Sequence, residues 1–138
     1  MPSIVADAGP LIALFDRNDR HHRRAVDFVT SCKERLVTNI PVLTEATHLL
    51  DFSAAAQREL LIWAHRSLII DENTKDDLPR IAAIIMKYRD SPADFADASL
   101  IALAERRGLR EIATIDSDFA IYRTHAKHTL HNVFPVTG

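Results

Sequence analysis

Acidic side chains are the residues of this chain whose positions suggest chemistry. Asp7 directly follows the apolar run Ser3–Ala6, and Asp116 directly follows Glu111–Ile115. Either residue alone could simply close a turn or cap a helix, since Asp is common at both positions. If both runs are strands of one parallel sheet, however, the two carboxylates lie at the same edge, where such sheets bind ligands.

A third acid, Glu45, falls on the apolar side of a predicted helix. It lies three residues after Val42 and four before Leu49, so these side chains share one face. Burying an unpaired carboxylate is costly, and such a group either takes a partner or becomes protonated. A metal ion would be such a partner. The open alternative is a Glu that extends from the edge of the stripe, near the positive end of its helix.

Asp94 and Asp97 differ in what local structure explains. With Ser91 as the N-cap and Pro92 at the first helical position, Asp94 occupies the third position and can close a capping box. Asp97 then lies a turn further in, beyond capping range and among apolar residues, so we predict no local structural role for it. Spaced three apart, the two carboxylates point towards the same space.

Several carboxylates gathered at one sheet edge repel one another and stay ionised together only if cations offset their charge. Mg²⁺ and Mn²⁺ suit sites made of oxygen atoms, and Mg²⁺ often shares the phosphates of a substrate. The pattern therefore predicts metal-dependent phosphodiester chemistry without a protein nucleophile. One or two ions remain open; in a two-ion site, roughly 3.5–4 Å apart, the attacking water and the leaving oxygen are both stabilised.

The elements that must position these acids alternate between short apolar runs and amphipathic segments. We predict strands at residues 3–6, 35–38, 68–70 and 111–115, with a fifth edge strand at 133–136. We predict helices at residues 11–15, 25–32, 41–50, 54–65, 75–88 and 91–107. The inward side of helix 75–88 should carry Leu78, Ile81, Ala82, Ile85 and Met86.

Strands joined by helices, without hairpin turns, imply right-handed crossovers and a sheet covered on both faces. We therefore predict an α/β fold with one domain over residues 1–138. It should be a three-layer α/β/α sandwich with a mostly parallel sheet of four to five strands.

Composition agrees with one globular domain of 138 residues, 47% hydrophobic and 26% charged. A net charge of −2 gives no overall positive field, so nucleic acid would have to bind local patches. The single Cys32 excludes an internal disulfide and suits a reducing compartment. With neither a signal segment nor an apolar run of the ~20 residues that a membrane span needs, we predict a cytoplasmic protein without membrane contact.

Two basic stretches are candidates for holding RNA phosphates, although a solvated surface is the ordinary explanation for each residue. They contain Arg17, Arg20, Arg23, Arg24, Arg123 and Lys127. His125, His128 and His131 would align on a helix, which raises the possibility of a zinc site. No nearby Cys or suitably spaced carboxylate supports it, so we assign these histidines to the surface or to RNA.

Taken together, four stretches resemble the PIN-domain family, and specifically the VapC-type toxins of toxin–antitoxin pairs. They are IVADAGPLIALF, IPVLTEATHLL, DFADASLIALAERRG and IATIDSDF, in the family's order between about residue 3 and residue 122. The resemblance implies a PIN-like fold and a metal-dependent endoribonuclease that hydrolyses RNA. It also implies a homodimer and an antitoxin whose tail covers the active site, as in a type II toxin–antitoxin pair.

The resemblance further implies roles for individual residues. Asp7 and Asp97 would hold Mg²⁺ or Mn²⁺, while Glu45 and Asp116 would complete the pocket and position water or a second ion. Thr114 matches a small hydroxyl residue before the fourth acid and would orient a water or a carboxylate. Asp94 and Asp118 are extra acids, and either could replace a neighbour in metal binding.

Two other kinds of protein fit parts of the pattern. A PIN-like module without catalysis could bind RNA or a protein, although the four acids argue against it. A receiver domain or a haloacid-dehalogenase-like phosphatase also places Asp at strand ends. The phosphatase needs a second Asp where Gly9 stands, and the receiver needs a Lys after a late strand, which we do not find.

Overall fold

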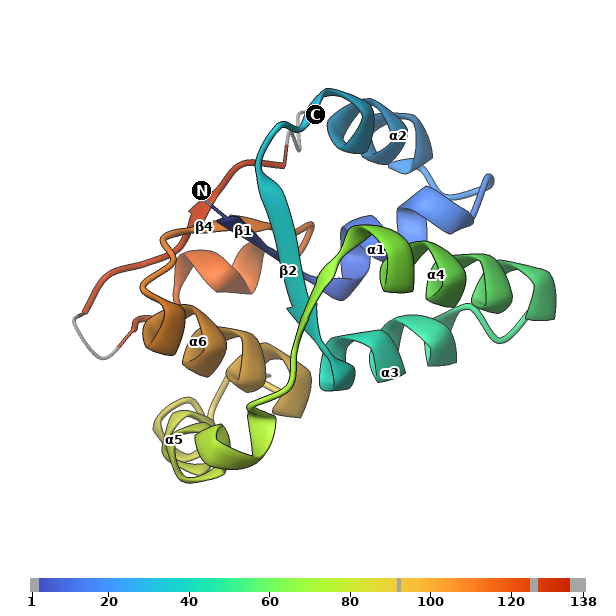
Figure 1. Cartoon of the computed structure of the whole chain (residues 1–138). Helices are drawn as coiled ribbons and strands as arrows, with labels where there is room; N and C mark the ends of the chain where they lie inside the picture. Colours follow the sequence, from blue (N-terminus) through green and yellow to red (C-terminus); the bar gives the residue numbers. More distant parts are fainter. Residues whose placement is uncertain (1–2, 92, 125–126, 135–138) are drawn as a thin grey trace.

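The central element of the fold is a five-stranded parallel sheet (Figure 1). The computed structural model describes residues 3–91, 93–124 and 127–134. The strands are β1 (Ser3–Ala6), β2 (Arg35–Asn39), β3 (Ile69–Asp71), β4 (Glu111–Ala113) and β5 (His131–Asn132). They lie in the order β3-β2-β1-β4-β5, and each neighbouring pair is parallel. The order reverses beside β1, so β1 and β4 frame the position where such sheets bind ligands.

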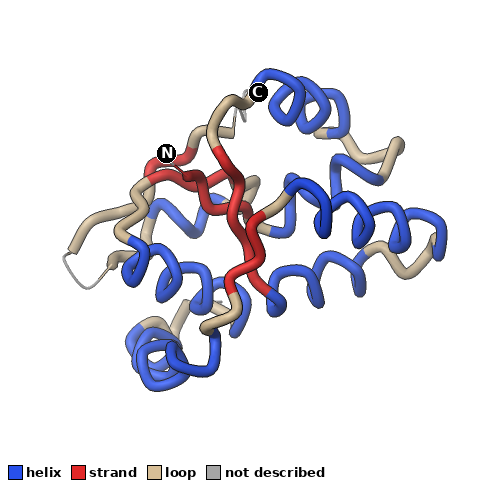
Figure 2. Tube along the Cα trace, in the orientation of Figure 1, coloured by secondary structure: helices blue, strands red, loops and turns tan. Residues whose placement is uncertain are grey.

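Helices cover both faces of the sheet, as Figure 2 shows for the whole trace. The helices α1, α2, α3 and α4 connect β1 to β2 and β2 to β3, while α5 and α6 return the chain to β4 on the other side. Their bounds are α1 (Ala8–Phe15), α2 (His22–Ser31), α3 (Ile40–Leu49), α4 (Ala54–Ser67), α5 (Thr74–Lys87) and α6 (Phe95–Arg107). A short 3-10 helix, η1 (Ser117–Ala120), follows β4. The predicted three-layer α/β/α sandwich is confirmed.

The hydrophobic core lies against the apolar residues of the central strands. Val5, Val37 and Ile112 are completely buried because helices cover both faces of the central strands. In α6, every residue from Ala96 to Ala104 is buried. Four of these nine residues are alanines, which allow the helix to pack closely between the sheet and α5.

The inward side of α5 differs from our prediction. Ile81 is buried as expected, but Leu78, Ile85 and Met86 are 46%, 37% and 63% exposed. The predicted inward residue Ala82 is exposed too, and the buried side carries Asp77, Ile81 and Ile84. Asp77 pairs with Arg106 of α6 at 2.9 Å, and this long-range ion pair favours the side of α5 that carries Asp77 as the buried one. In α3, the predicted inward Leu49 is likewise 52% exposed.

The last two strands also differ in extent from the prediction. β4 ends at Ala113 instead of Ile115, because the backbone of Thr114 pairs with the side chain of Asn132 and leaves the regular ladder. β5 is formed by His131–Asn132, ahead of the predicted strand 133–136, of which residues 135 and 136 lie outside the described residues. Within the described part of the chain, no helix combines the length and apolar character needed to cross a membrane.

Candidate active site

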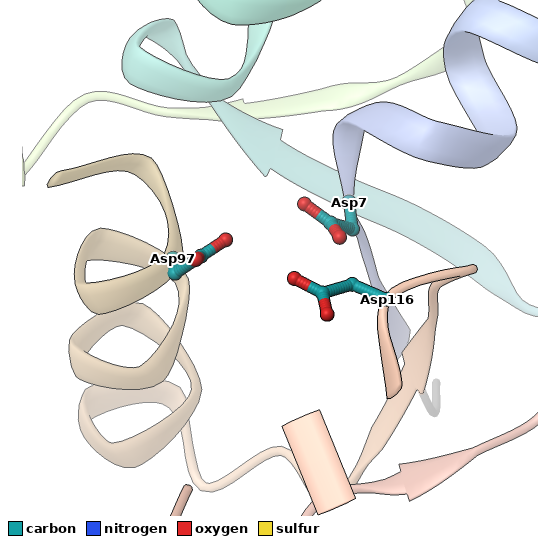
Figure 3. A group of neighbouring side chains, drawn as sticks. All are labelled: Asp7, Asp97 and Asp116. Atoms are coloured by element: carbon teal, nitrogen blue, oxygen red, sulfur yellow. The ribbon is translucent and has the colours of Figure 1, made fainter. Parts of the chain in front are cut away.

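Three carboxylates converge beside the carboxyl ends of β1 and β4, at the point where the strand order reverses (Figure 3). Asp7 follows β1, Asp97 lies in the first turn of α6, and Asp116 follows β4 after a two-residue link. One oxygen atom from each carboxylate lies within 4.8 Å of the others. Asp7 thus meets two acids that lie at least 90 residues further along the chain, and Asp7 and Asp116 meet as the strand-end argument predicts.

Asp7 is the most enclosed of the three, with a residue exposure of 4%. Its Oδ2 accepts a 2.7 Å hydrogen bond from the hydroxyl of Thr114. Its Oδ1 is buried and has no hydrogen-bond partner among the described residues. Burial raises the pKa of Asp7 to about 6, and the charges of Asp116 and Asp94 act in the same direction. A buried, unpaired carboxylate oxygen next to two other acids is a group that a cation would satisfy.

Asp94 and Asp97 form a capping box, but in a different register from the one we predicted. α6 begins at Phe95, so Asp94 is its N-cap and Asp97 is the third helical residue. The Asp97 amide donates to Asp94 Oδ1 at 2.8 Å, and the Asp94 amide donates to Asp97 Oδ2 at 3.4 Å. Ser91 instead donates its amide to Tyr88 in the turn after α5. The proposed N-cap was therefore wrong, and the Pro92 on which it relied lies outside the described residues.

This correction gives Asp97 two roles. It closes the capping box, which explains its place near the helix N-terminus. Asp97 is nevertheless only 6% exposed, and its side chain faces the other acids (Figure 3). Burial raises the pKa of Asp97 to about 8, followed by repulsion from Asp94, Asp7 and Asp116. The capping hydrogen bond lowers this pKa by less than burial and repulsion raise it. A cation bound beside Asp97 would therefore stabilise its ionised form.

Glu45 lies across the same space, on α3. A cavity of about 420 Å³, which we call the acidic cavity, is lined among others by Asp7, Glu45, Asp94, Asp97, Asp116 and Asp118. Glu45 is half-buried, and burial followed by the charge of Asp94 raises its pKa to about 7. A larger and mostly apolar groove of about 690 Å³ adjoins the acidic cavity and shares Glu45 and Asp94 with it.

Asp116 is held by the turn that starts η1. Its Oδ1 accepts the amide of Asp118 at 2.8 Å, and its own amide donates to the Thr114 hydroxyl at 2.9 Å. Burial raises the pKa of Asp116 above its ordinary value. We considered that Asp116 could simply cap a helix, and it does cap η1. The same residue also lines the acidic cavity.

Sequence reasoning missed the polar residues that hold these elements together. Asn39 caps α3 by accepting the Val42 amide at 3.1 Å and donates Nδ2 to Ser99 on α6 at 3.0 Å. Ser99 in turn donates to the Ala96 carbonyl at 2.6 Å. This buried chain fixes the start of α3 against the start of α6. Asn39 before Ile40-Pro41 was a readable cap signal, whereas the contact with Ser99, sixty residues away, was not.

The basic residues lie outside this arrangement. None of the six candidates, all of them among the described residues, lines the acidic cavity. The Arg123 side chain donates to the carbonyls of Ala120 and Ile121, and Arg23 pairs with Asp27 on α2. RNA contacts for Arg17, Arg20, Arg24 and Lys127 stay predictions. His131 lies in β5 and His128 in an irregular segment, so the helix on which they would align does not form there; His125 lies outside the described residues.

The comparison with protein families decides between the candidate folds. Residues 4–124 match the family model of the PIN domain. The chain belongs to the PIN domain family. This PIN domain is 26% identical over 116 residues to Ribonuclease VapC26 of Mycobacterium tuberculosis, and the match covers 82% of this chain and 86% of that protein. The resemblance to the VapC-type members of the family is thereby confirmed, and the receiver and phosphatase alternatives are ruled out.

A solved structure shares the fold of this PIN domain. The crystal structure of Mycobacterium tuberculosis VapC20, a sarcin-ricin loop cleaving toxin, superposes with a TM-score of 0.77 at 22% sequence identity. The match covers 86% of this PIN domain and 93% of the VapC20 chain. At that identity the likeness shows the shared architecture.

Proposed function

We propose that this PIN domain, spanning residues 1–138, is a metal-dependent endoribonuclease and the toxin of a type II toxin–antitoxin pair. The observation that carries the proposal is the meeting of Asp7, Asp97 and Asp116, whose oxygens lie within 4.8 Å of one another around an unpaired buried oxygen of Asp7. The similarity to a protein named as a ribonuclease supports the choice of RNA as substrate.

The donor set fits Mg²⁺ or Mn²⁺, because it consists of carboxylate oxygens without Cys or His. Asp7, Asp97 and Asp116 would hold the ion, with Asp94 or Asp118 within the same cavity as further ligands. When bound, a divalent ion neutralises the phosphate charge and makes a water molecule more acidic. Its positive charge would also allow the crowded carboxylates to ionise together.

The protein side chains would divide the remaining work. Asp7, Asp97 and Asp116 would orient the scissile phosphate through the ion. Glu45, which lines the same cavity and would be ionised beside the cation, would accept a proton from the attacking water at its carboxylate. Thr114 would keep the Asp7 carboxylate in place through its 2.7 Å hydrogen bond.

Partners follow from the same family membership. The proposed toxin role requires an antitoxin, and VapC20 is an example of a relative in fold that is described as a toxin. A homodimer and a cytoplasmic location remain predictions from the sequence and the family resemblance.

The test is cleavage of a structured RNA by the purified chain with Mg²⁺ or Mn²⁺, compared with EDTA. Asp7→Asn and Asp97→Asn should abolish cleavage because each removes a charged ligand. Asp76→Asn is the matched control, since Asp76 is exposed on α5 and lies outside the acidic cavity. Cleavage that survives EDTA or both substitutions would reject the metal mechanism. RNA binding without cleavage by the wild type would instead favour the binding module.

A further inference from the structure

The edge strand β5 contributes one side chain that contacts the site region: Asn132 is exposed, but its amide group reaches Thr114. Asn132 lies next to Ile112 in the β4–β5 ladder. Its Oδ1 accepts the Thr114 amide at 3.2 Å, and its Nδ2 donates to the Thr114 carbonyl at 3.0 Å. The amide side chain therefore pairs with both backbone groups of Thr114, at a position where the regular ladder has ended. Oδ1 also accepts the Phe134 amide at 3.0 Å, which ties the following segment to the same point.

Thr114 passes this restraint to two acids of the cluster. Its hydroxyl donates to Asp7 Oδ2 at 2.7 Å and accepts the Asp116 amide at 2.9 Å. The preceding residue, Ala113, accepts the Asp7 amide at 3.0 Å. Thr114 is 1% exposed, so its hydroxyl is shielded from water as an alternative hydrogen-bond partner. Any shift of the Thr114 backbone would therefore move the Asp7 carboxylate and the Asp116 backbone together.

We propose that Asn132 is a positioning residue for the metal site, acting through Thr114 on Asp7 and Asp116. The inference rests on the proposed function, because it assumes that these acids bind a divalent ion. Groups that orient metal ligands affect metal affinity even though they do not touch the ion. Asn132 acts one contact further out, and its clamp is made by two hydrogen bonds to a single residue, so losing it should loosen both acids at once.

The alternative is that Asn132 only fastens β5 to the sheet. Its neighbour His131 offers a control within the same strand, because the His131 amide donates to the Arg110 carbonyl at 2.7 Å through the backbone alone. His131 is exposed and lies on the same two-residue strand. His131→Ala thus changes a side chain of β5 while the backbone attachment of the strand and Thr114 stay as they are, and it serves as the matched control for a substitution in this strand.

The experiment is calorimetric titration of the metal-free protein with Mn²⁺, in the absence of RNA. Asn132→Ala should raise the Mn²⁺ dissociation constant about tenfold, the lower end of the effect of groups that orient ligands. Thr114→Val, which removes the hydroxyl, should raise it by about 10–100-fold. Asn132→Ser, too short to bridge both backbone groups, should behave like Asn132→Ala, and His131→Ala should bind like the wild type.

A double substitution tests the route of the effect. If Asn132 acts through the Thr114 hydroxyl, adding Asn132→Ala to Thr114→Val should weaken Mn²⁺ binding no further. Additive losses would overturn the proposed route, and so would wild-type affinity in folded Asn132→Ala or Asn132→Ser. Circular dichroism checks that each variant is folded. Failure of the wild type to bind Mn²⁺ would overturn the proposed function and this inference with it, whereas Mn²⁺ binding that is insensitive to Asn132 overturns the inference alone.

Discussion

Two groups of acids lie at carboxyl ends of parallel strands in this protein, and they have opposite electrostatic surroundings. Asp71, the last residue of β3, is buried and accepts hydrogen bonds from Arg106 at 2.7 Å and from Arg107 at 2.6 Å. Asp77 pairs with the same Arg106. We call this group the arginine-paired cluster. Burial opposes ionisation of Asp71, but the bonds from the two arginines outweigh it and lower the pKa to about 2.

The acidic cavity has no such compensation. None of its lining residues is Lys or Arg within the described ranges, and burial raises the pKa values of Asp7 to about 6 and of Asp97 to about 8. Aspartate is thus paired with arginine in the arginine-paired cluster, whereas in the acidic cavity it has no positively charged partner. An acid at the end of a strand is therefore a candidate for ligand binding. Whether a Lys or Arg side chain pairs with it then distinguishes a structural acid from a binding one.

The largest expected effect is on cleavage. Asp97→Asn should lower the RNA cleavage rate by more than about 100-fold, because losing a direct ligand costs more than losing a group that orients one. Asp71→Asn should leave the rate per folded molecule near that of the wild type, since Asp71 is already paired with arginines. Both rates are measured at saturating Mn²⁺. Equal losses in the two variants would erase the distinction between the two clusters.

The metal-free protein should respond to pH in two opposite ways. Raised pKa values favour the protonated folded state, so the contribution of Asp7 is complete below its ordinary value of 3.8 and is lost as the pH rises through about 6. For this buried group the loss is on the order of 3 kcal/mol. Asp97 and Glu45 extend the decline towards pH 8. The contribution of Asp71 is present above pH 3.8 and is lost as the pH falls through about 2.

Urea denaturation across pH checks this behaviour. The free energy of unfolding without metal should be highest at about pH 3–4, between the loss of the Asp71 contribution and the loss of the Asp7 contribution, and fall on both sides. Saturating Mn²⁺ should flatten the decline above that maximum, because the cation takes over the role of the proton. A metal-free stability that rises steadily from pH 5 to 8 would contradict the raised pKa values.

Substitution in the arginine-paired cluster should lower stability more than cleavage, the opposite of the effect expected in the acidic cavity. Asp71→Asn should destabilise the protein by about 2 kcal/mol, the range for buried hydrogen bonds to charged groups, because Arg106 and Arg107 lose an anionic partner. Asp27→Asn, which removes the exposed ion pair with Arg23, should cost less than about 1 kcal/mol. Urea unfolding at pH 7 measures both. An unchanged midpoint in Asp71→Asn would show that the arginines do not depend on Asp71.

Asp94 should give a smaller effect on stability than Asp71. Asp94→Ala removes the N-cap of α6 and should cost about 1 kcal/mol, whereas Asp94→Asn keeps a good cap and should remain as stable as the wild type. Thermal unfolding of the two variants measures the difference. Complete loss of cleavage in well-folded Asp94→Ala would show that Asp94 is an essential part of the metal site.

The sequence was sufficient for the architecture because alternating apolar runs and helices leave few topologies open, and because acids after β1 and β4 must meet once those strands are neighbours. It was not sufficient where distant contacts decide a local choice. The inward side of α5 depends on the pair of Asp77 with Arg106, twenty-nine residues away. The clamp of Asn132 on Thr114 likewise has no local signature.

The start of α6 shows a different limit. Ser91-Pro92 and Asp94 are both good helix starts, so the sequence contains two competing signals three residues apart. The structure uses Asp94, and this shift by one turn brings Asp97 into the first turn. The site acids were therefore found for a partly wrong reason, since Asp97 does have a local capping role in addition to facing the cavity.

We propose that Asp7, Asp97 and Asp116 need a divalent cation, whereas the arginine-paired cluster does not. Anomalous diffraction from crystals soaked in Mn²⁺ tests it most directly. We expect a strong peak between the carboxylates of Asp7, Asp97 and Asp116 that disappears in Asp97→Asn, and no peak beside Asp71. A Mn²⁺ peak elsewhere, with none among these three carboxylates, would contradict it.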